Sequence, residues 1–117
     1  MQVRSEAHSG LFGLYELTGD GTVLYSRSRG ERGLASPSDE AVGRDYFHDI
    51  APFENIADLR RHFRRFLTDN RASDTFVFDC LFDTEIVRAK VFMTRAYEVD
   101  HDHAGGIVIM DIRQLAE

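Results

Sequence analysis

Four consecutive polar residues near the C-terminus have side chains that could bind a metal ion. Asp100, His101, Asp102 and His103 supply carboxylates and imidazoles, which are good ligands for zinc or nickel. Two glycines follow shortly after, a composition typical of a hairpin turn. Side chains in a flexible turn are not held in ligand geometry, so we expect a solvated loop and no metal site.

Four arginines lie within a single short segment of the chain. Arg60, Arg61, Arg64 and Arg65 fall on one side of a helix at this spacing, where they could bind phosphate or an acidic partner. An exposed, solvated helix face is the simpler interpretation.

No motif in the chain is typical of an enzyme. It has no Gly-x-Ser-x-Gly motif, no phosphate loop of the Walker type and no Rossmann glycine set. Its single cysteine, Cys80, excludes an internal disulfide and fits a reducing, cytoplasmic setting. We therefore predict a protein that is not an enzyme.

Charge and hydropathy argue against two classes of partner. Fourteen Lys and Arg against twenty Asp and Glu give a net charge of -6, which repels the phosphate backbone of nucleic acids. No apolar run is long enough to span a membrane, and the N-terminus has no secretory pattern. With 117 residues, 43% of them hydrophobic, we expect one folded domain over residues 1–117 with a core at about 11–113.

Apolar and alternating patterns predict five strands. Two of them flank a Gly-Asp-Gly turn and form a hairpin, because this turn accepts positive φ angles. The segment 28–39 has loop composition and separates the hairpin from the rest. The predicted strands are residues 11–17, 22–25, 76–83, 87–94 with an extension to Val99, and 107–112.

Helices are predicted between the hairpin and the last three strands. Ser38 or Asp39 is expected to cap a short helix at residues 41–42, which Gly43 ends, and residues 46–50 form another turn. Asn55 is expected to cap a longer helix. Its apolar stripe consists of Ile56, Leu59, Phe63, Phe66 and Leu67. The order of elements predicts an α+β fold, a five-stranded antiparallel sheet with short helices packed on one face.

Residues 42–52, Val-Gly-Arg-Asp-Tyr-Phe-His-Asp-Ile-Ala-Pro, closely resemble the stretch that precedes the chromophore-binding cysteine in the photoactive yellow protein family of PAS domains. A looser similarity covers residues 11–112. The resemblance implies the PAS fold. It also implies a non-catalytic sensory or interaction module of a bacterial signalling protein, acting through a homodimer or by docking a protein partner.

The resemblance breaks down at the chromophore site. The family's cysteine forms a thioester with a hydroxycinnamoyl chromophore, whereas Phe53 stands in that place and offers no nucleophile. Ser26 and Gly30 match the family's Tyr and Glu, which hydrogen-bond the phenolate. Tyr25 could replace the Tyr only in a shifted register. We predict a PAS scaffold that lacks this light sensor and requires no cofactor.

An apolar interior between helices and sheet is a further implication of the PAS fold. Its side chains could line a pocket for a small apolar ligand, or could simply fill the space and leave a purely structural dimerisation domain. The residues concerned are Phe47, Phe53, Phe63, Phe78, Phe82 and Met93.

Haem is an alternative cofactor for a PAS domain. Some gas-sensing members hold the iron through one histidine on the helix that corresponds to residues 56–67, where His62 is the histidine present. His62 lies roughly 90° from the middle of the apolar stripe, and Leu59 matches the ligand position. We expect a partly exposed, structural His62, with a haem-binding gas sensor as the alternative.

Overall fold

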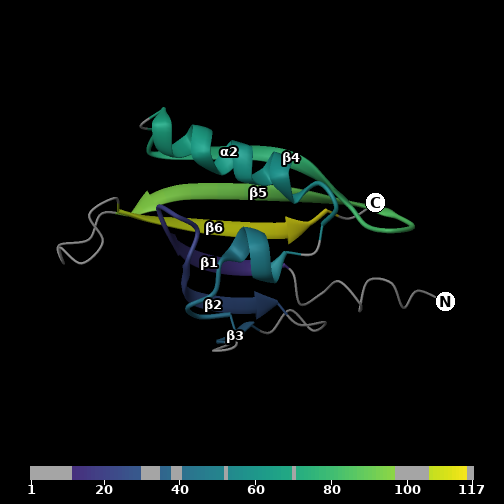
Figure 1. The fold of residues 1–117 in the computed structure, drawn as a ribbon, viewed down its shortest axis with the longest axis horizontal. Coiled ribbons are helices and arrows are strands. Elements are labelled where there is room, and N and C mark those ends of the chain that lie inside the picture. The colour runs from purple at the N-terminus through teal and green to yellow at the C-terminus, as the bar shows by residue number, and fades with distance from the viewer. Residues whose placement is uncertain are drawn as a thin grey trace.

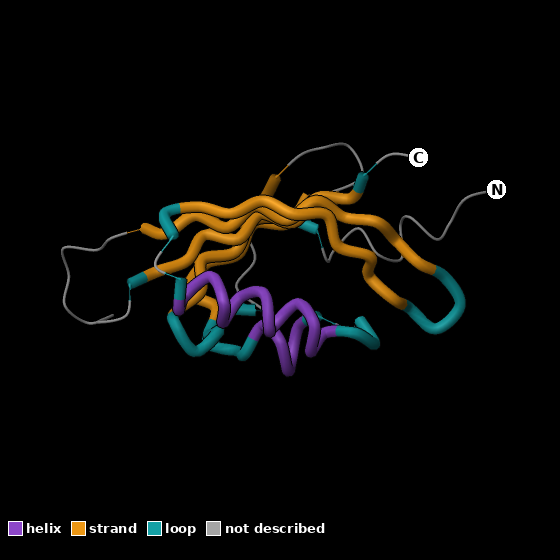
Figure 2. The backbone as a smooth tube through the Cα atoms, turned by 90° about the horizontal axis from the view of Figure 1, so that it is seen from above, coloured by secondary structure: helices purple, strands orange, loops and turns teal. Residues whose placement is uncertain are grey.

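A curved antiparallel sheet with helices on one face forms the protein (Figures 1 and 2). The computed structural model describes residues 12–29, 35–37, 41–51, 53–69, 71–96 and 106–115. The strands are β1 (Gly13–Thr18), β2 (Val23–Arg29), β3 (Ala35–Pro37), β4 (Ser73–Leu81), β5 (Ile86–Ala96) and β6 (Ile107–Gln114). They lie in the order β3-β2-β1-β6-β5-β4. The α+β fold and its five predicted strands are confirmed.

A sixth strand, β3, lies within the segment predicted as a loop. It is three residues long and pairs with β2, so that Pro37 lies opposite Arg27. Its place at the end of the strand order leaves one side without a neighbour, which is where a sheet tolerates proline. The prediction failed here because so short a strand shows no alternation.

Alternation along the strands decides which side chains enter the core. Phe78 and Cys80 of β4 are buried, and Val87, Ala89, Val91 and Met93 of β5 are buried with them. Strand β4 begins at Ser73, three residues earlier than predicted, because Ser73 pairs with Thr94 of the long strand β5. The predicted extension of this strand is confirmed as far as Ala96, and its last residues, 97–99, lie outside the described residues together with the polar residues 100–103.

The first described helical turn is η2 (Tyr46–Ile50), a single turn of π-helix. Its preceding residue, Asp45, accepts hydrogen bonds from the backbone amides of Phe47 (2.9 Å) and His48 (3.2 Å). This satisfies amides that a helix start leaves without partners.

The short helix predicted at residues 41–42 is not formed. Val23 of β2 donates to the Arg44 carbonyl (2.9 Å) and accepts from the Gly43 amide (2.8 Å), which ties this segment to the sheet as a turn. Gly43 has φ +88°, so the turn depends on the conformational freedom of glycine.

The longer helix, α2 (Ile56–Thr68), packs on the concave side of the sheet (Figure 2). Leu59, Phe63 and Phe66 are its buried residues and face the core as predicted. Asn55 precedes the helix, but its side chain makes no capping hydrogen bond and binds β4 instead. No helix in the described part of the chain is both long and apolar enough to cross a membrane.

Candidate functional site

Five side chains predicted to line an interior pocket lie together in one hydrophobic core. Phe47, Phe53, Phe63, Phe78 and Met93 are at most 7% exposed. The rings of Phe47 and Phe63 lie 5.0 Å apart between centroids, which joins η2 to α2. These contacts are those of side chains that fill an interior.

Phe53 lies between the helical layer and the end of β4. Its ring meets that of Phe82 edge to face at 5.5 Å and that of Phe78 at 6.4 Å. Phe53 is 3% exposed, and Phe82 is partly buried against the same core. The next residue holds this position in place, because the Glu54 amide donates to the Leu81 carbonyl at 2.8 Å.

Two buried tyrosines, which the sequence analysis did not single out, lie at the centre of the interior. The rings of Tyr15 and Tyr46 are 4.8 Å apart. Burial raises the pKa of Tyr15 to about 12. It also raises the pKa of Tyr46 well above its usual value, with smaller contributions from Tyr15 and Cys80. Both phenols therefore stay neutral. The available signal was the alternation along β1, which places Tyr15 and Leu17 on the same buried face.

Ser26, which the resemblance aligns with the family's phenolate-binding Tyr, is buried on the inner face of β2 opposite Tyr15. Tyr25 lies opposite Glu16 and so belongs to the other face of the sheet. In this strand pairing Ser26, and not Tyr25, points into the interior. Gly30 lies outside the described residues.

The thiol of Cys80 lies in the same interior. Cys80 is fully buried in β4, and burial, aided by the neighbouring Asp79 carboxylate, raises the pKa of its thiol to about 12. Because the thiolate is the reactive form of cysteine, this side chain is a poor nucleophile.

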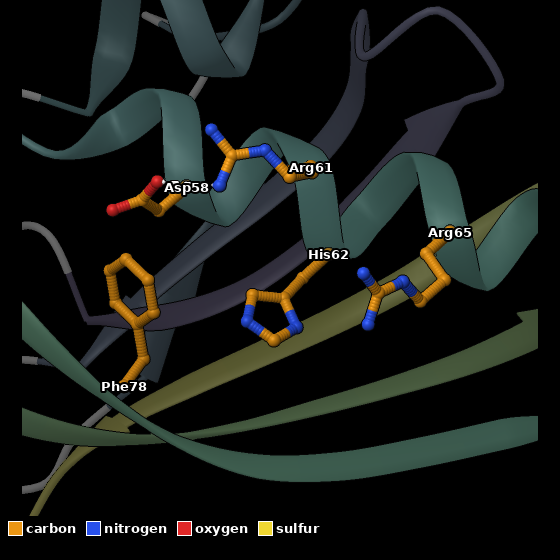
Figure 3. Close-up of a pocket in the computed structure, with 5 residues that line it drawn as sticks. All are labelled: Asp58, Arg61, His62, Arg65 and Phe78. Atoms are coloured by element: carbon orange, nitrogen blue, oxygen red, sulfur yellow. Dashed lines mark hydrogen bonds and ion pairs between the residues drawn. The ribbon is translucent and has the colours of Figure 1, made fainter.

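A groove of about 340 Å³ lies between α2 and β4 (Figure 3). Phe78 is the one predicted interior aromatic that reaches it. The lining side chains are Asp58, Arg61, His62, Arg65 and Phe78. The four helix residues recur at i, i+3, i+4 and i+7, a spacing that places them on one flank of α2. The spacing of these four residues is visible in the sequence, but the sequence does not show that this flank of α2 lies beside β4.

His62 is half-buried, in agreement with the expected partial exposure. Its ring stacks on that of Phe76 with centroids 4.2 Å apart and an angle of 14° between planes, and it meets Phe78 edge-on at 6.2 Å. The ring therefore lies in the groove beside β4, whereas Leu59 and Phe63 face the core. To bind haem iron inside the core, the imidazole would have to leave Phe76.

Two of the four arginines enter the groove. Arg61 forms an ion pair with Asp58 at 2.8 Å. Arg65 forms no ion pair with any described residue, and the same is true of Arg60 and Arg64 on the neighbouring flank. The groove thus carries positive charge in a chain whose net charge is -6. Within the described ranges, no three side chains cluster as metal ligands, and residues 100–103 lie outside them.

Comparison with known proteins gives one related sequence and several similar folds. No family model matches the chain. Photoactive yellow protein from Rhodothalassium salexigens is 34% identical over 92 residues, which cover 76% of this chain and 71% of that protein.

The structural matches are more distant in sequence and support the fold alone. The photoactive yellow protein domain of the sensor histidine kinase Ppr from Rhodospirillum centenum has a TM-score of 0.60 at 21% identity, covering 92% of this chain and 96% of that one. The PAS domain of Bordetella pertussis BvgS has a TM-score of 0.55 at 10% identity, covering 96% and 84%. Drosophila melanogaster Cycle PAS-B with bound ethylene glycol has a TM-score of 0.54 at 14% identity, covering 88% and 99%.

Proposed function

This chain belongs to the photoactive yellow protein family and has the PAS fold, and from that premise we propose that it is a non-catalytic sensory module of a bacterial signalling protein. Its response is the docking of a protein partner or of a second copy of itself, without a covalent chromophore. The observation that carries the proposal is the packing of Phe53.

The resemblance aligns Phe53 with the chromophore-binding cysteine of the family. A phenyl ring cannot form a thioester, and this ring is buried against Phe78 and Phe82. Cys80 does not compensate, because its thiol is buried on β4 and its pKa is raised to about 12. Both findings support a module that does not hold the hydroxycinnamoyl group.

The packed interior favours docking over ligand binding. Tyr15 and Tyr46 pack ring to ring at the centre, and Phe47 and Phe63 close the space between η2 and α2. A small apolar ligand would have to displace these side chains and lose their contacts. A partner that binds the surface leaves these interior contacts intact, so we favour surface docking as the event that changes the state of the module.

Signalling by docking requires two arrangements of the module. A partner shifts the balance between them by as much as its affinities for the two arrangements differ, and equal affinity shifts nothing. The contact of α2 with β4 is a place where such a difference can arise, because α2 lies over the strand at the sheet edge (Figure 1).

Absorption spectra of the purified protein test the proposal directly. The protein is mixed with an activated hydroxycinnamic thioester, and separately with haem, and examined by visible absorption and intact mass. We expect neither an adduct nor a Soret band. Phe53→Cys, treated in the same way, is the positive control for access of the reagent to this position.

A yellow adduct on the unmodified chain would overturn the proposal, and so would a Soret band that disappears in His62→Ala. Light scattering during size-exclusion chromatography, over a dilution series, then separates self-association from docking of a different protein. A dimer that dissociates on dilution supports self-association, and a monomer throughout supports a different partner.

A further inference from the structure

The edge of the sheet at β4 is partly closed by the chain itself. The Asn55 side chain donates to the Asp79 carbonyl at 2.8 Å and accepts from the Leu81 amide at 3.1 Å. The Glu54 amide donates to the Leu81 carbonyl at 2.8 Å. Residues 54–55 thus bind the C-terminal end of β4 much as a neighbouring strand would.

Farther along this edge, the Thr75 amide donates to the Asp74 side chain at 3.0 Å, and the described residues leave the backbone groups of Val77 open. The backbone N–H and C=O groups of successive residues in an antiparallel strand point alternately to its two sides. The groups of Asp79 and Leu81 point to the edge of the sheet, so those of Val77 and Thr75 point to the edge as well. The Arg95 amide donates to the Ala72 carbonyl at 2.8 Å, which agrees with even-numbered residues facing β5. No described residue binds the Val77 amide or carbonyl on the open side, so they form a template for another strand.

The groove lies directly beside this open edge. Figure 3 shows His62 and Arg65 extending from α2 toward the strands, Arg61 lying along the helix toward Asp58, and Phe78 rising from β4. Asp58 pairs with Nη1 of Arg61, while Arg65 has no counter-ion among the described side chains. His62, which stacks on Phe76, lines the groove between the two arginines. The edge therefore combines free backbone groups with local positive charge.

We propose that an extended, acidic segment of a partner protein adds to β4 at Val77 as a further strand, with carboxylates in the groove against Arg61 and Arg65. The inference rests on the proposed docking function and identifies the chemistry of the partner. Side chains of an added strand alternate between faces, so every second residue enters the groove. The others lie beside Val77, which is 54% exposed. Strand addition of this kind is a recurring mode of peptide recognition.

Charge selects the segment that fits. A guanidinium binds a carboxylate through paired, charge-assisted hydrogen bonds, whereas a lysine in the same place would be repelled by Arg61 and Arg65. Phe78 supplies an apolar wall for the methylene groups of a glutamate side chain.

Three synthetic peptides test the proposal on the full chain. The first is a labelled heptapeptide of alternating glutamate and threonine, the second has lysine in place of glutamate, and the third is the acidic peptide with N-methyl groups on alternate residues. Binding is followed by fluorescence anisotropy, and amide hydrogen exchange is followed at Val77. We expect the acidic peptide alone to bind, and bound peptide to slow exchange of the Val77 amide.

Two matched double variants separate local contact from overall charge. Arg61→Gln with Arg65→Gln removes the groove cations, and Arg60→Gln with Arg64→Gln removes the same charge from the neighbouring flank. Loss of charge-assisted bonds predicts weakening of about tenfold or more for the first pair, and less than about threefold for the second. Circular dichroism checks that both variants fold.

Equal losses in the two double variants would overturn the proposal, because the attraction would then be unspecific. Equal binding of the N-methylated peptide would exclude strand addition, and failure of the acidic peptide to bind would exclude the site. None of these results bears on the chromophore test. The proposed function fails on its own if a hydroxycinnamoyl adduct forms.

Discussion

The guanidinium of Arg95 caps the end of α2 at Phe66: its Nη2 donates to the Phe66 carbonyl at 2.9 Å, and the group lies 5.1 Å from the centre of the Phe66 ring. The same side chain donates to the carbonyls of Leu67 and Arg71. One cation from β5 thus binds the carbonyl oxygens that a helix end leaves without partners, where a positive charge also favours the helix dipole.

Replacing Arg95 by Met should loosen the attachment of α2 to the sheet. Hydrogen bonds from a charged donor contribute about 1.5–3 kcal/mol, so we expect the free energy of unfolding in urea to fall by that amount. Arg88→Met in the same strand is the control. It breaks an exposed ion pair with Asp79, which contributes at most about 1 kcal/mol. Equal losses of unfolding free energy in the two variants would show that the Arg95 cap stabilises the fold no more than an exposed ion pair does.

Gly21 holds the hairpin turn against η2. It has φ +92°, its carbonyl accepts from the Tyr46 amide at 2.9 Å, and an added Cβ would lie 3.0 Å from the Phe47 ring. Gly21→Ala should therefore lower the free energy of unfolding by at least about 1–2 kcal/mol, from backbone strain alone. Gly19→Ala is the matched control, because no atom lies within 4 Å of its added Cβ. Thermal melts of both variants make the comparison, and equal melting temperatures would contradict it.

Regular alternation made the long strands predictable, and tertiary contacts account for the errors. Apolar residues at every second position identify β5, and the apolar stripe identifies α2. Asparagine is a favoured helix cap, so the sequence predicts Asn55 as the cap of α2, and only the position of β4 shows that its side chain binds the strand instead.

The groove could not be inferred from one segment, since Phe78 and the α2 side chains are brought together by the fold. Tyr15 shows the same limit, because its partner Tyr46 is distant in sequence. A local pattern shows which side of one helix or strand is buried, whereas a site depends on which helices and strands then come into contact.

Asn55 should protect the C-terminal end of β4 from exchange with water. Asn55→Ala removes both hydrogen bonds to β4, and we expect faster exchange of the Leu81 amide and a loss of about 1 kcal/mol. Asn55→Asp keeps the acceptor for the Leu81 amide and loses the donor to Asp79, so it should retain most of the protection. If the Leu81 amide of Asn55→Ala exchanges as slowly as in the parent chain, this amide does not depend on the Asn55 side chain.

Cys80 should make the stability of the fold fall at alkaline pH. Its thiol has an ordinary pKa of 9.0 and a pKa of about 12 when folded, so above pH 9 the unfolded chain releases a proton that the folded chain keeps. The free energy of unfolding therefore decreases as pH rises from 9 toward 12, by about 1.4 kcal/mol for each pH unit per group. Tyr15 adds to the slope above its ordinary value of 10.0.

Cys80→Ala removes one of these protons, and urea unfolding at pH 8, 9 and 10 measures the effect. We expect a shallower decline between pH 9 and pH 10 than in the parent chain, whatever the offset between the two at pH 8. Parallel declines would mean that the thiol titrates alike in the folded and unfolded chains.

Phe53→Ala should open a cavity at the position that the resemblance aligns with the family's cysteine. Truncation of a buried phenylalanine costs about 3–5 kcal/mol, because contacts are lost and the surroundings relax only in part. An apolar cavity of this kind can bind a small apolar molecule, so indole should raise the melting temperature of Phe53→Ala and leave that of the parent unchanged. Phe82→Ala is the control, since its partly buried ring should cost less. A parent chain that indole also stabilises would show that the interior already has room for a ligand.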